Sequence, residues 1–477
     1  MIKQALRANV IYAIGSLANG LALFILLPYF VNALSQERYG IWALLEITIS
    51  FISMFMLIGL DMGMLRHYWF LTDGQARRVL IGTALIGVLV WGALLTMFFL
   101  GVAWLWQLWR GAYPLGISAA DVWLTVSIGW AEALFALYLS VFRAREQAVG
   151  FAGFSLLRMT LFIVAAISGV AFGGGITGAL FGRLFSVVVT LFIVTFTLRR
   201  AFALAFNRPL FLTMARYGFP LLPANIAGYF LFASDRYFLN IFTSPAVVAV
   251  YNFAYKISAS LDILITRPFA TDWAARRFQI AASSNPQVRY AWAIVLYLYA
   301  GAGTALLIWI GSPLLYAWIA PLEYHSGLAL IPILLAAYLA YGLSYPFNIG
   351  LIIKDQTRWL PFINGGATIL YILLNLWLVP RYQMMGAAWA TLFAYAVMTI
   401  TLFVFSQYYY PIKVSLQPFV TIGIGVIAVL LWAILVSSFG NTLLLIVGTT
   451  VRTVGMIFIW LSTGAALWHF WRKSRVA

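Results

Sequence analysis

The run VLIGTALIGVLVWGALLTMFFLGVAWLWQ, residues 79–107, decides the fold, because it carries no charged side chain over its whole length. A helix needs about 20 apolar residues to cross the hydrocarbon core of a bilayer, and this run is longer. It is apolar on every face, whereas the strands of a membrane barrel alternate apolar and polar residues. We therefore predict a transmembrane helix here.

The rest of the chain has the same character. Its 477 residues are 64% hydrophobic and only 9% charged, with a mean hydropathy of +0.97. Soluble domains carry about 25% charged residues, so the composition excludes an ordinary soluble protein. The chain has no cysteine, which excludes disulfide frameworks, thiolate metal sites and cysteine nucleophiles.

Apolar runs of this kind recur along the whole length, and we predict an all-α polytopic membrane protein of about fourteen transmembrane helices. Their expected bounds are 8–33, 40–64, 79–107, 122–142, 154–172, 177–198, 217–242, 248–270, 289–312, 326–352, 359–379, 386–407, 417–436 and 442–469.

Lysine and arginine are distributed unevenly over the connections between these helices. With the N-terminus in the cytoplasm, twenty of the 29 basic residues fall on the cytoplasmic side, and the outer loops hold only Arg38, Arg110 and Arg381. This bias predicts that both termini are cytoplasmic. The net charge of +17 then reflects topology, and we expect no nucleic-acid partner.

The predicted helices leave only short segments of the chain outside the membrane. The longest expected connection, 199–216, is too short for an extramembrane domain, and no phosphate-binding G-x-x-x-x-G-K-[ST] motif occurs. The three histidines, His67, His325 and His469, are separated along the chain, so we expect neither a metal site nor catalytic residues. We predict that the protein is not an enzyme and has no bound cofactor.

A weak internal repeat has an offset of 208 residues. Tyr29-Phe30-Val31-Asn32 matches Tyr237-Phe238-Leu239-Asn240, and Gly178-Ala179 matches Gly386-Ala387. Chance matches in so apolar a chain are the alternative explanation. A six-helix offset predicts two parallel lobes, 1–200 and 201–410, followed by 411–477 with helices 13 and 14 and a cytoplasmic tail. Such lobes normally enclose a central site, which favours a transporter.

Charged groups at membrane depth each need a partner, water or a function. They are Glu46, Asp61, Glu132, Arg158, Arg183, Asp235, Arg236, Lys256, Asp262, Arg267 and Arg452. Arg158 and Arg267 lie near the cytoplasmic ends of their helices, so we interpret them as snorkelling side chains. Asp61, also near a helix end, is interpreted as a capping or solvated group.

Polar side chains form stripes on four predicted helices, the first, second, seventh and eighth, which suggests that these helices face a shared hydrated cavity. Interhelical hydrogen bonding is the alternative. The stripes are Asn9, Tyr12, Ser16 and Asn19; Glu46, Ser50, Ser53 and Asp61; Asn225, Tyr229 and Arg236; and Asn252, Lys256 and Ser260.

Asp235 and Lys256 reach similar depths, so we predict that they form an ion pair and leave Arg236 to face the cavity. If the pair only locks the helical hairpin, it has no contact with substrate.

Cations in such a cavity favour an anionic substrate, and the planar fork of arginine suits a phosphate. The predicted substrate-binding residues are Arg183, Arg236, Lys256, Asn252 and Asn19. Coupling to a proton or sodium gradient would need a carboxylate, with Glu132 the first candidate and Glu46 the second. Either carboxylate could instead be the permanent partner of a cation such as Arg183.

Several motifs resemble those of polysaccharide and O-antigen flippases, which belong to the multidrug/oligosaccharidyl-lipid/polysaccharide exporter superfamily. The motifs are Tyr39-Gly40-Ile41-Trp42, Tyr217-Gly218-Phe219-Pro220, Ala233-Ser234-Asp235-Arg236-Tyr237-Phe238-Leu239, Val250-Tyr251-Asn252-Phe253-Ala254-Tyr255-Lys256, and Leu374-Asn375-Leu376-Trp377-Leu378-Val379-Pro380 followed by Gly386-Ala387-Ala388. Each motif is degenerate, and the specificity comes from their order and spacing.

The resemblance implies two lobes around a central cavity and alternating access. It also implies transfer of an undecaprenyl-diphosphate-linked oligosaccharide across a bacterial inner membrane, for O-antigen, lipopolysaccharide or exopolysaccharide synthesis, with helices 13 and 14 beside a groove for the lipid tail. A polysaccharide polymerase or export complex would be the protein partner. The alternatives are a cation-coupled multidrug exporter, a lipid II flippase and, in a different class, a membrane glycosyltransferase or polymerase.

Overall fold

The computed structural model describes residues 11, 15, 22 and 24–413, and all regular secondary structure in this part of the chain is helical. The expected all-α membrane architecture is therefore confirmed. Eight helices in the described part are long and apolar enough to cross a membrane. They are Gln36–Leu57, Gly74–Arg110, Ala119–Ala144, Ala148–Thr197, Pro245–Ala274, Pro286–Ile319, Leu322–Ile353 and Trp359–Tyr409.

Two of these eight helices each contain two of the predicted spans. Ala148–Thr197 is interrupted by a five-residue π-helix, η2 (Val170–Gly174), and Trp359–Tyr409 is broken at Gln383, where φ is +48°. The predicted span 217–242 is also divided, into α9 (Leu222–Ala233) and α10 (Asp235–Phe242). Spans 417–436 and 442–469 lie outside the described residues, so the total of fourteen stays a prediction.

The chain divides into two compact units. Unit 1 comprises Met1–Asn252 and Ile319–Glu323, and unit 2 comprises Phe253–Trp318 and Tyr324–Ala477. The lobe boundaries predicted at residues 200 and 410 rest on the repeat alone and stay predictions.

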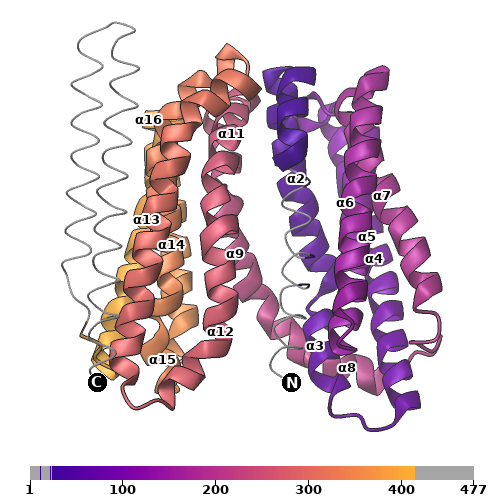
Figure 1. Cartoon of the computed structure of the whole chain (residues 1–477). Coiled ribbons are helices and arrows are strands. Elements are labelled where there is room, and N and C mark those ends of the chain that lie inside the picture. The colour runs from indigo at the N-terminus through magenta and orange to yellow at the C-terminus, as the bar shows by residue number, and fades with distance from the viewer. Residues whose placement is uncertain (1–10, 12–14, 16–21, 23, 414–477) are drawn as a thin grey trace, which may run out of the picture. The chain divides into compact units, whose positions relative to one another are not determined.

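Unit 1 is built around α5. The helix α5 packs against α2, α4 and α7, while α6 packs along α7 (Figure 1). Besides α9 and α10, the elements of this unit are α2 (Gln36–Leu57), α3 (Leu60–Tyr68), α4 (Gly74–Arg110), η1 (Pro114–Gly116), α5 (Ala119–Ala144), α6 (Ala148–Gly169), η2, α7 (Gly175–Thr197), α8 (Arg208–Gly218), η3 (Phe219–Leu221) and the beginning of α11 (Pro245–Leu261).

Unit 2 is organised around the contact between α14 and α16. The remainder of α11 continues through a π-helix into α12, so the helix predicted to end at residue 270 runs on to Ala281. The elements are η4 (Asp262–Thr266), α12 (Arg267–Ala281), α13 (Pro286–Ile319), η5 (Leu322–Leu330), α14 (Ile331–Phe347), α15 (Ile349–Ile353) and α16 (Trp359–Tyr409).

Glycine permits one backbone contact that shapes unit 1. A Cβ atom on Gly40 of α2 would lie 1.7 Å from the carbonyl oxygen of Pro245, the first residue of α11. The same end of α2 is tied to the segment 319–323, because Gln36 Nε2 donates to the carbonyl oxygen of Glu323 at 3.3 Å. The motif that begins at Tyr39 therefore has a packing role, since only glycine fits at its second position.

Gly40→Ala should destabilise the protein by about 1–3 kcal/mol, because the methyl group has no space beside the Pro245 backbone. Gly101→Ala is the matched control, because it also lies inside a helix of unit 1 and has nothing within 4 Å of its added Cβ. The control should be neutral or slightly stabilising, since alanine favours helix. Thermal unfolding of both detergent-purified variants tests this, and equal melting temperatures would contradict it.

Candidate functional site

Glu132 on α5 lies between two arginines from neighbouring helices. Its Oε1 accepts hydrogen bonds from Arg158 on α6 and from Nε of Arg183 on α7, the latter at 3.3 Å. All three side chains are buried, with exposed fractions between 6% and 13%. We call these three residues the Glu132 cluster. It forms because α5, α6 and α7 pack side by side and bring the three side chains to one depth.

The Glu132 cluster holds one more positive charge than negative charge, since two arginines share one carboxylate. Nη1 of Arg183 is buried and has no hydrogen-bond partner among the described residues. A buried guanidinium with an unused donor is suited to a phosphate or carboxylate, which accepts strong charge-assisted hydrogen bonds.

The structure tests two predictions about residues of the Glu132 cluster. The snorkelling interpretation of Arg158 is wrong, because the residue is buried and pairs with Glu132 instead of reaching water. Glu132 pairs with Arg183, which matches the alternative that this carboxylate is the partner of a cation.

Asp235, at the start of α10, organises a second buried group that we call the Asp235 cluster, with Arg236 and Tyr251. Its Oδ1 accepts from Arg236 Nη1 at 2.9 Å, and its Oδ2 accepts from the Tyr251 hydroxyl at 2.5 Å. Arg236 Nη1 also donates to the carbonyl oxygen of Phe232. This cluster is electrically neutral.

The expectation that Arg236 is left unpaired is therefore wrong. Adjacent residues on a helix normally point apart, but Arg236 folds back, because Asp235 is the carboxylate at its own depth. Lys256 is half-buried on α11 and belongs to unit 2, so its predicted pair with Asp235 stays a prediction.

The polar stripes predicted on the second and seventh helices do meet within unit 1. Two residues outside the stripes add a contact between the same helices, since Thr48 on α2 and Tyr237 on α10 share a hydrogen bond of 2.7 Å between their hydroxyls. Ser50, one turn after the half-buried Glu46, is hydrogen-bonded to Tyr229 of α9. The contacts are direct, as the interhelical-bonding alternative requires.

Asn252 on α11 also makes an interhelical contact, because its Nδ2 donates to the Tyr39 hydroxyl at 3.1 Å. Asn19 and Arg452 lie outside the described residues.

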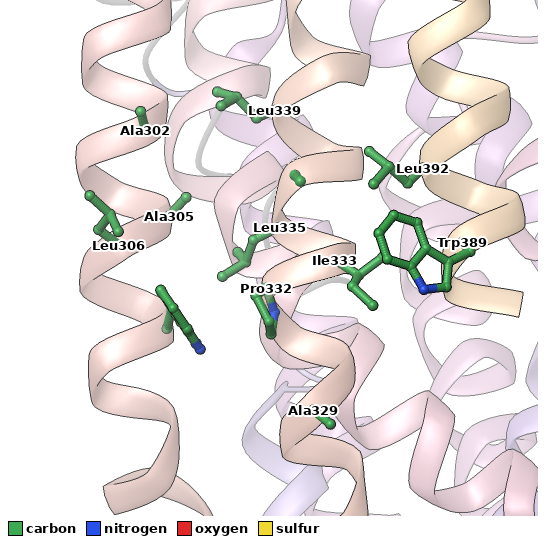
Figure 2. Close-up of a pocket in the computed structure, with 12 residues that line it drawn as sticks. Ala302, Ala305, Leu306, Ala329, Pro332, Ile333, Leu335, Leu339, Trp389 and Leu392 are labelled. Carbon is green, nitrogen blue, oxygen red and sulfur yellow. The ribbon is translucent and has the colours of Figure 1, made fainter. Parts of the chain in front are cut away.

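The described residues of unit 2 contribute a half-exposed ion pair, an exposed pair between Arg276 and Asp272, and an apolar cavity. Asp262 in η4 accepts from Arg267 Nε at 2.8 Å, and Arg267 lies within a continuous helix instead of at a helix end. The cavity has a volume of about 400 Å³ and lies between α13, α14 and α16 (Figure 2). Its walls, which include Leu339, Trp389 and Leu392, carry no charge, so the cavity suits hydrocarbon and does not suit a phosphate.

Sequence reasoning gave no role to the two tyrosines that complete these contacts, Tyr39 and Tyr251. Each begins or nearly begins one of the motifs that carry the family resemblance, and that position was the available signal. In the described part of the chain, no group of three His, Asp or Glu side chains could hold a metal ion.

Comparison with known proteins gives a family match and a fold match. The family described as "Polysaccharide biosynthesis protein" matches residues 6–271. No protein with a curated description matches the sequence.

Among solved structures, the lipid II flippase MurJ in an inward-closed conformation has a TM-score of 0.75 at 13% identity, covering 96% of this chain and 99% of that chain. A MATE transporter of Vibrio cholerae has a TM-score of 0.62 at 14% identity, covering 85% and 96%. A transporter of the MOP superfamily from Pyrococcus furiosus has a TM-score of 0.60 at 16% identity, covering 84% and 94%. At these sequence identities, the similarity shows a shared fold alone.

Glu132→Gln should destabilise the protein more than Arg183→Gln. Loss of the carboxylate removes the acceptor that two buried arginines share and should cost about 3–5 kcal/mol, whereas loss of Arg183 keeps the Glu132–Arg158 pair. Thermal unfolding of the purified variants measures the difference. If Arg183→Gln were as costly as Glu132→Gln, the two arginines would not share one counterion.

Tyr251→Phe should cost about 1–3 kcal/mol, because it leaves one oxygen of the buried Asp235 without its donor. Tyr316→Phe is the control, since the Tyr316 hydroxyl is fully buried and has no partner in the described part of the chain. The control should be neutral. Equal losses of stability in the two variants would contradict the role assigned to the Tyr251 hydroxyl.

Proposed function

Since the chain belongs to the polysaccharide biosynthesis protein family, we propose that it is a flippase for a lipid-linked oligosaccharide. The substrate is an undecaprenyl-diphosphate-linked glycan, carried from the cytoplasmic to the outer leaflet of a bacterial inner membrane by alternating access of two lobes. The product feeds the synthesis of O-antigen or exopolysaccharide, with a polymerase or export complex as protein partner. The protein acts as a carrier and catalyses no covalent step.

The observation that carries this proposal is the surplus positive charge of the Glu132 cluster. A buried arginine with an unused donor, such as Arg183, is expensive inside a membrane protein, and it is retained where it serves an anion. A diphosphate supplies that anion, and it is the one part of the substrate that hydrocarbon cannot accommodate. Arg183, with its unused Nη1 donor, is accordingly the first candidate for the diphosphate contact.

The other site residues have supporting roles in this proposal. Arg236, Lys256, Asn252 and Asn19 complete the substrate path for diphosphate and sugar. Arg236 must break its ion pair with Asp235 before it can contact the substrate, so it binds after Arg183. Glu46 becomes the first candidate for coupling to a proton or sodium gradient, because Glu132 is already shared by two cations.

The closest competing functions are those of the fold neighbours. The fold likeness to a lipid II flippase favours a second lipid-diphosphate substrate, lipid II, which the same cationic cluster would serve. A cationic drug, by contrast, would be repelled by the surplus charge, so a multidrug exporter fits less well.

The decisive experiment is reconstitution of the purified protein into liposomes with undecaprenyl-diphosphate oligosaccharides. We expect protein-dependent translocation, which Arg183→Gln should slow by about tenfold or more, because one charge-assisted hydrogen bond to phosphate is lost. Arg381→Gln, which removes an exposed arginine from a predicted outer loop, is the matched control and should transport normally.

Two outcomes would count against the proposal. Absence of translocation for every lipid-diphosphate glycan and for lipid II would overturn the flippase function. Normal transport by a well-folded Arg183→Gln variant would keep the function but remove Arg183 from the site.

A further inference from the structure

A basic surface at one end of unit 1 is assembled from two segments that are far apart in the sequence. The connection between α7 and α8 lies on the first turns of α4, since Ala203 N donates to the carbonyl oxygen of Arg78 at 3.0 Å. Asn207 N donates to Thr83 Oγ1 at 3.1 Å. Gly82 makes this approach possible, because a Cβ atom there would lie 1.8 Å from the carbonyl oxygen of Ala203.

Arginines dominate the two segments, 66–83 and 196–217. They contain one acidic residue, Asp73, whose carboxylate is already used to cap α4 by accepting from the backbone N–H groups of Gln75 and Ala76. The arginines number seven: Arg66, Arg77, Arg78, Arg199, Arg200, Arg208 and Arg216.

The backbone contact at Ala203 limits how far three of these arginines can lie from one another. Arg200 is three residues from Ala203 and Arg208 is five, so their backbones lie within about 11 Å and about 18 Å of it. Arg78, Arg200 and Arg208 are all exposed. Burial, and then the charge of Arg66, lower the pKa of His67, so at neutral pH the positive charge of this surface comes from arginine alone.

Large apolar side chains are exposed on the same two segments. Leu204 is 88% exposed and Phe70 is 75% exposed, and Trp69 and Phe206 are exposed as well. The spans α4 and α7 begin and end beside these residues, at Gly74 and Thr197, so the surface lies where the helices leave the hydrocarbon. Basic residues interleaved with exposed apolar ones are typical of surfaces that sit in a membrane interface.

We propose that this surface, which we call the Arg200 surface, binds the headgroup phosphate of an anionic phospholipid. The guanidinium groups of Arg78, Arg200 and Arg208 hold the phosphate, and Leu204 and Phe206 insert beside the acyl chains. The apolar side chains favour a lipid over free phosphate, which would gain nothing from them. This inference is independent of the transported substrate, because it concerns a bilayer lipid bound outside the charged clusters of the membrane interior.

Retention of phosphatidylglycerol tests the proposal. The full chain is reconstituted in nanodiscs of mixed phosphatidylcholine and phosphatidylglycerol and extracted in mild detergent, and the bound lipid is counted by native mass spectrometry. The wild type should retain phosphatidylglycerol in preference to phosphatidylcholine. The triple variant R78Q/R200Q/R208Q should retain about a hundredfold less, since each arginine contributes about fivefold.

A control of equal charge separates a site from a general effect of net charge. Arg276, Arg289 and Arg358 are exposed arginines of unit 2, and R276Q/R289Q/R358Q should retain phosphatidylglycerol as the wild type does. Equal losses in both triple variants would overturn the proposal, as would displacement of the lipid by millimolar inorganic phosphate. If the first triple variant does not fold, the three single variants replace it, and each should lose about fivefold.

Discussion

The interior of a bilayer offers no hydrogen bonds, and this constraint governs the rest of the structure. Every polar group that enters the hydrocarbon has to find its partner within the protein. Unit 1 meets the requirement with short-range contacts between helices: Glu132 with two arginines, Asp235 with its own neighbour Arg236, and Thr48 with Tyr237. Each of these contacts also fixes the rotation of the helices that supply it, so satisfying the polar groups and packing the helices are one process.

Both buried clusters give charged groups partners within the protein, but they differ in their balance of charge. In the Asp235 cluster one arginine meets one carboxylate, and the Tyr251 hydroxyl satisfies the second carboxylate oxygen. The charges of Asp235 and Arg236 balance each other, which suits a fixed structural element. In the Glu132 cluster two arginines share one carboxylate, and Arg183 keeps an unused donor. The share of negative charge for each arginine is therefore smaller in the Glu132 cluster, and an arginine with an unused donor is suited to an anionic ligand.

Hydropathy predicted the helices well, because each span must be long and apolar whatever surrounds it. It could not predict the partners of the charges. The depth of a residue in the membrane follows from its position along the helix. The neighbour that its side chain faces depends on how the surrounding helices pack. Arg158 lies near a helix end, which favours snorkelling, but it pairs with Glu132. Counting residues likewise could not predict that Arg236 folds back onto its neighbour Asp235. The break at Gln383 likewise depends on a backbone angle that composition does not reveal.

The unmatched charge of the Glu132 cluster has an electrical consequence. A charge that moves through the full membrane potential gains or loses about 2.3 kcal/mol per 100 mV. The cluster joins α5, α6 and α7, so any motion that carries these helices along the membrane normal also carries one elementary charge through part of that field. An inside-negative potential therefore favours the position closer to the cytoplasm, whereas a diphosphate bound at Arg183, with about two negative charges, would reverse that preference. The membrane potential therefore acts differently on the protein with and without a bound anion.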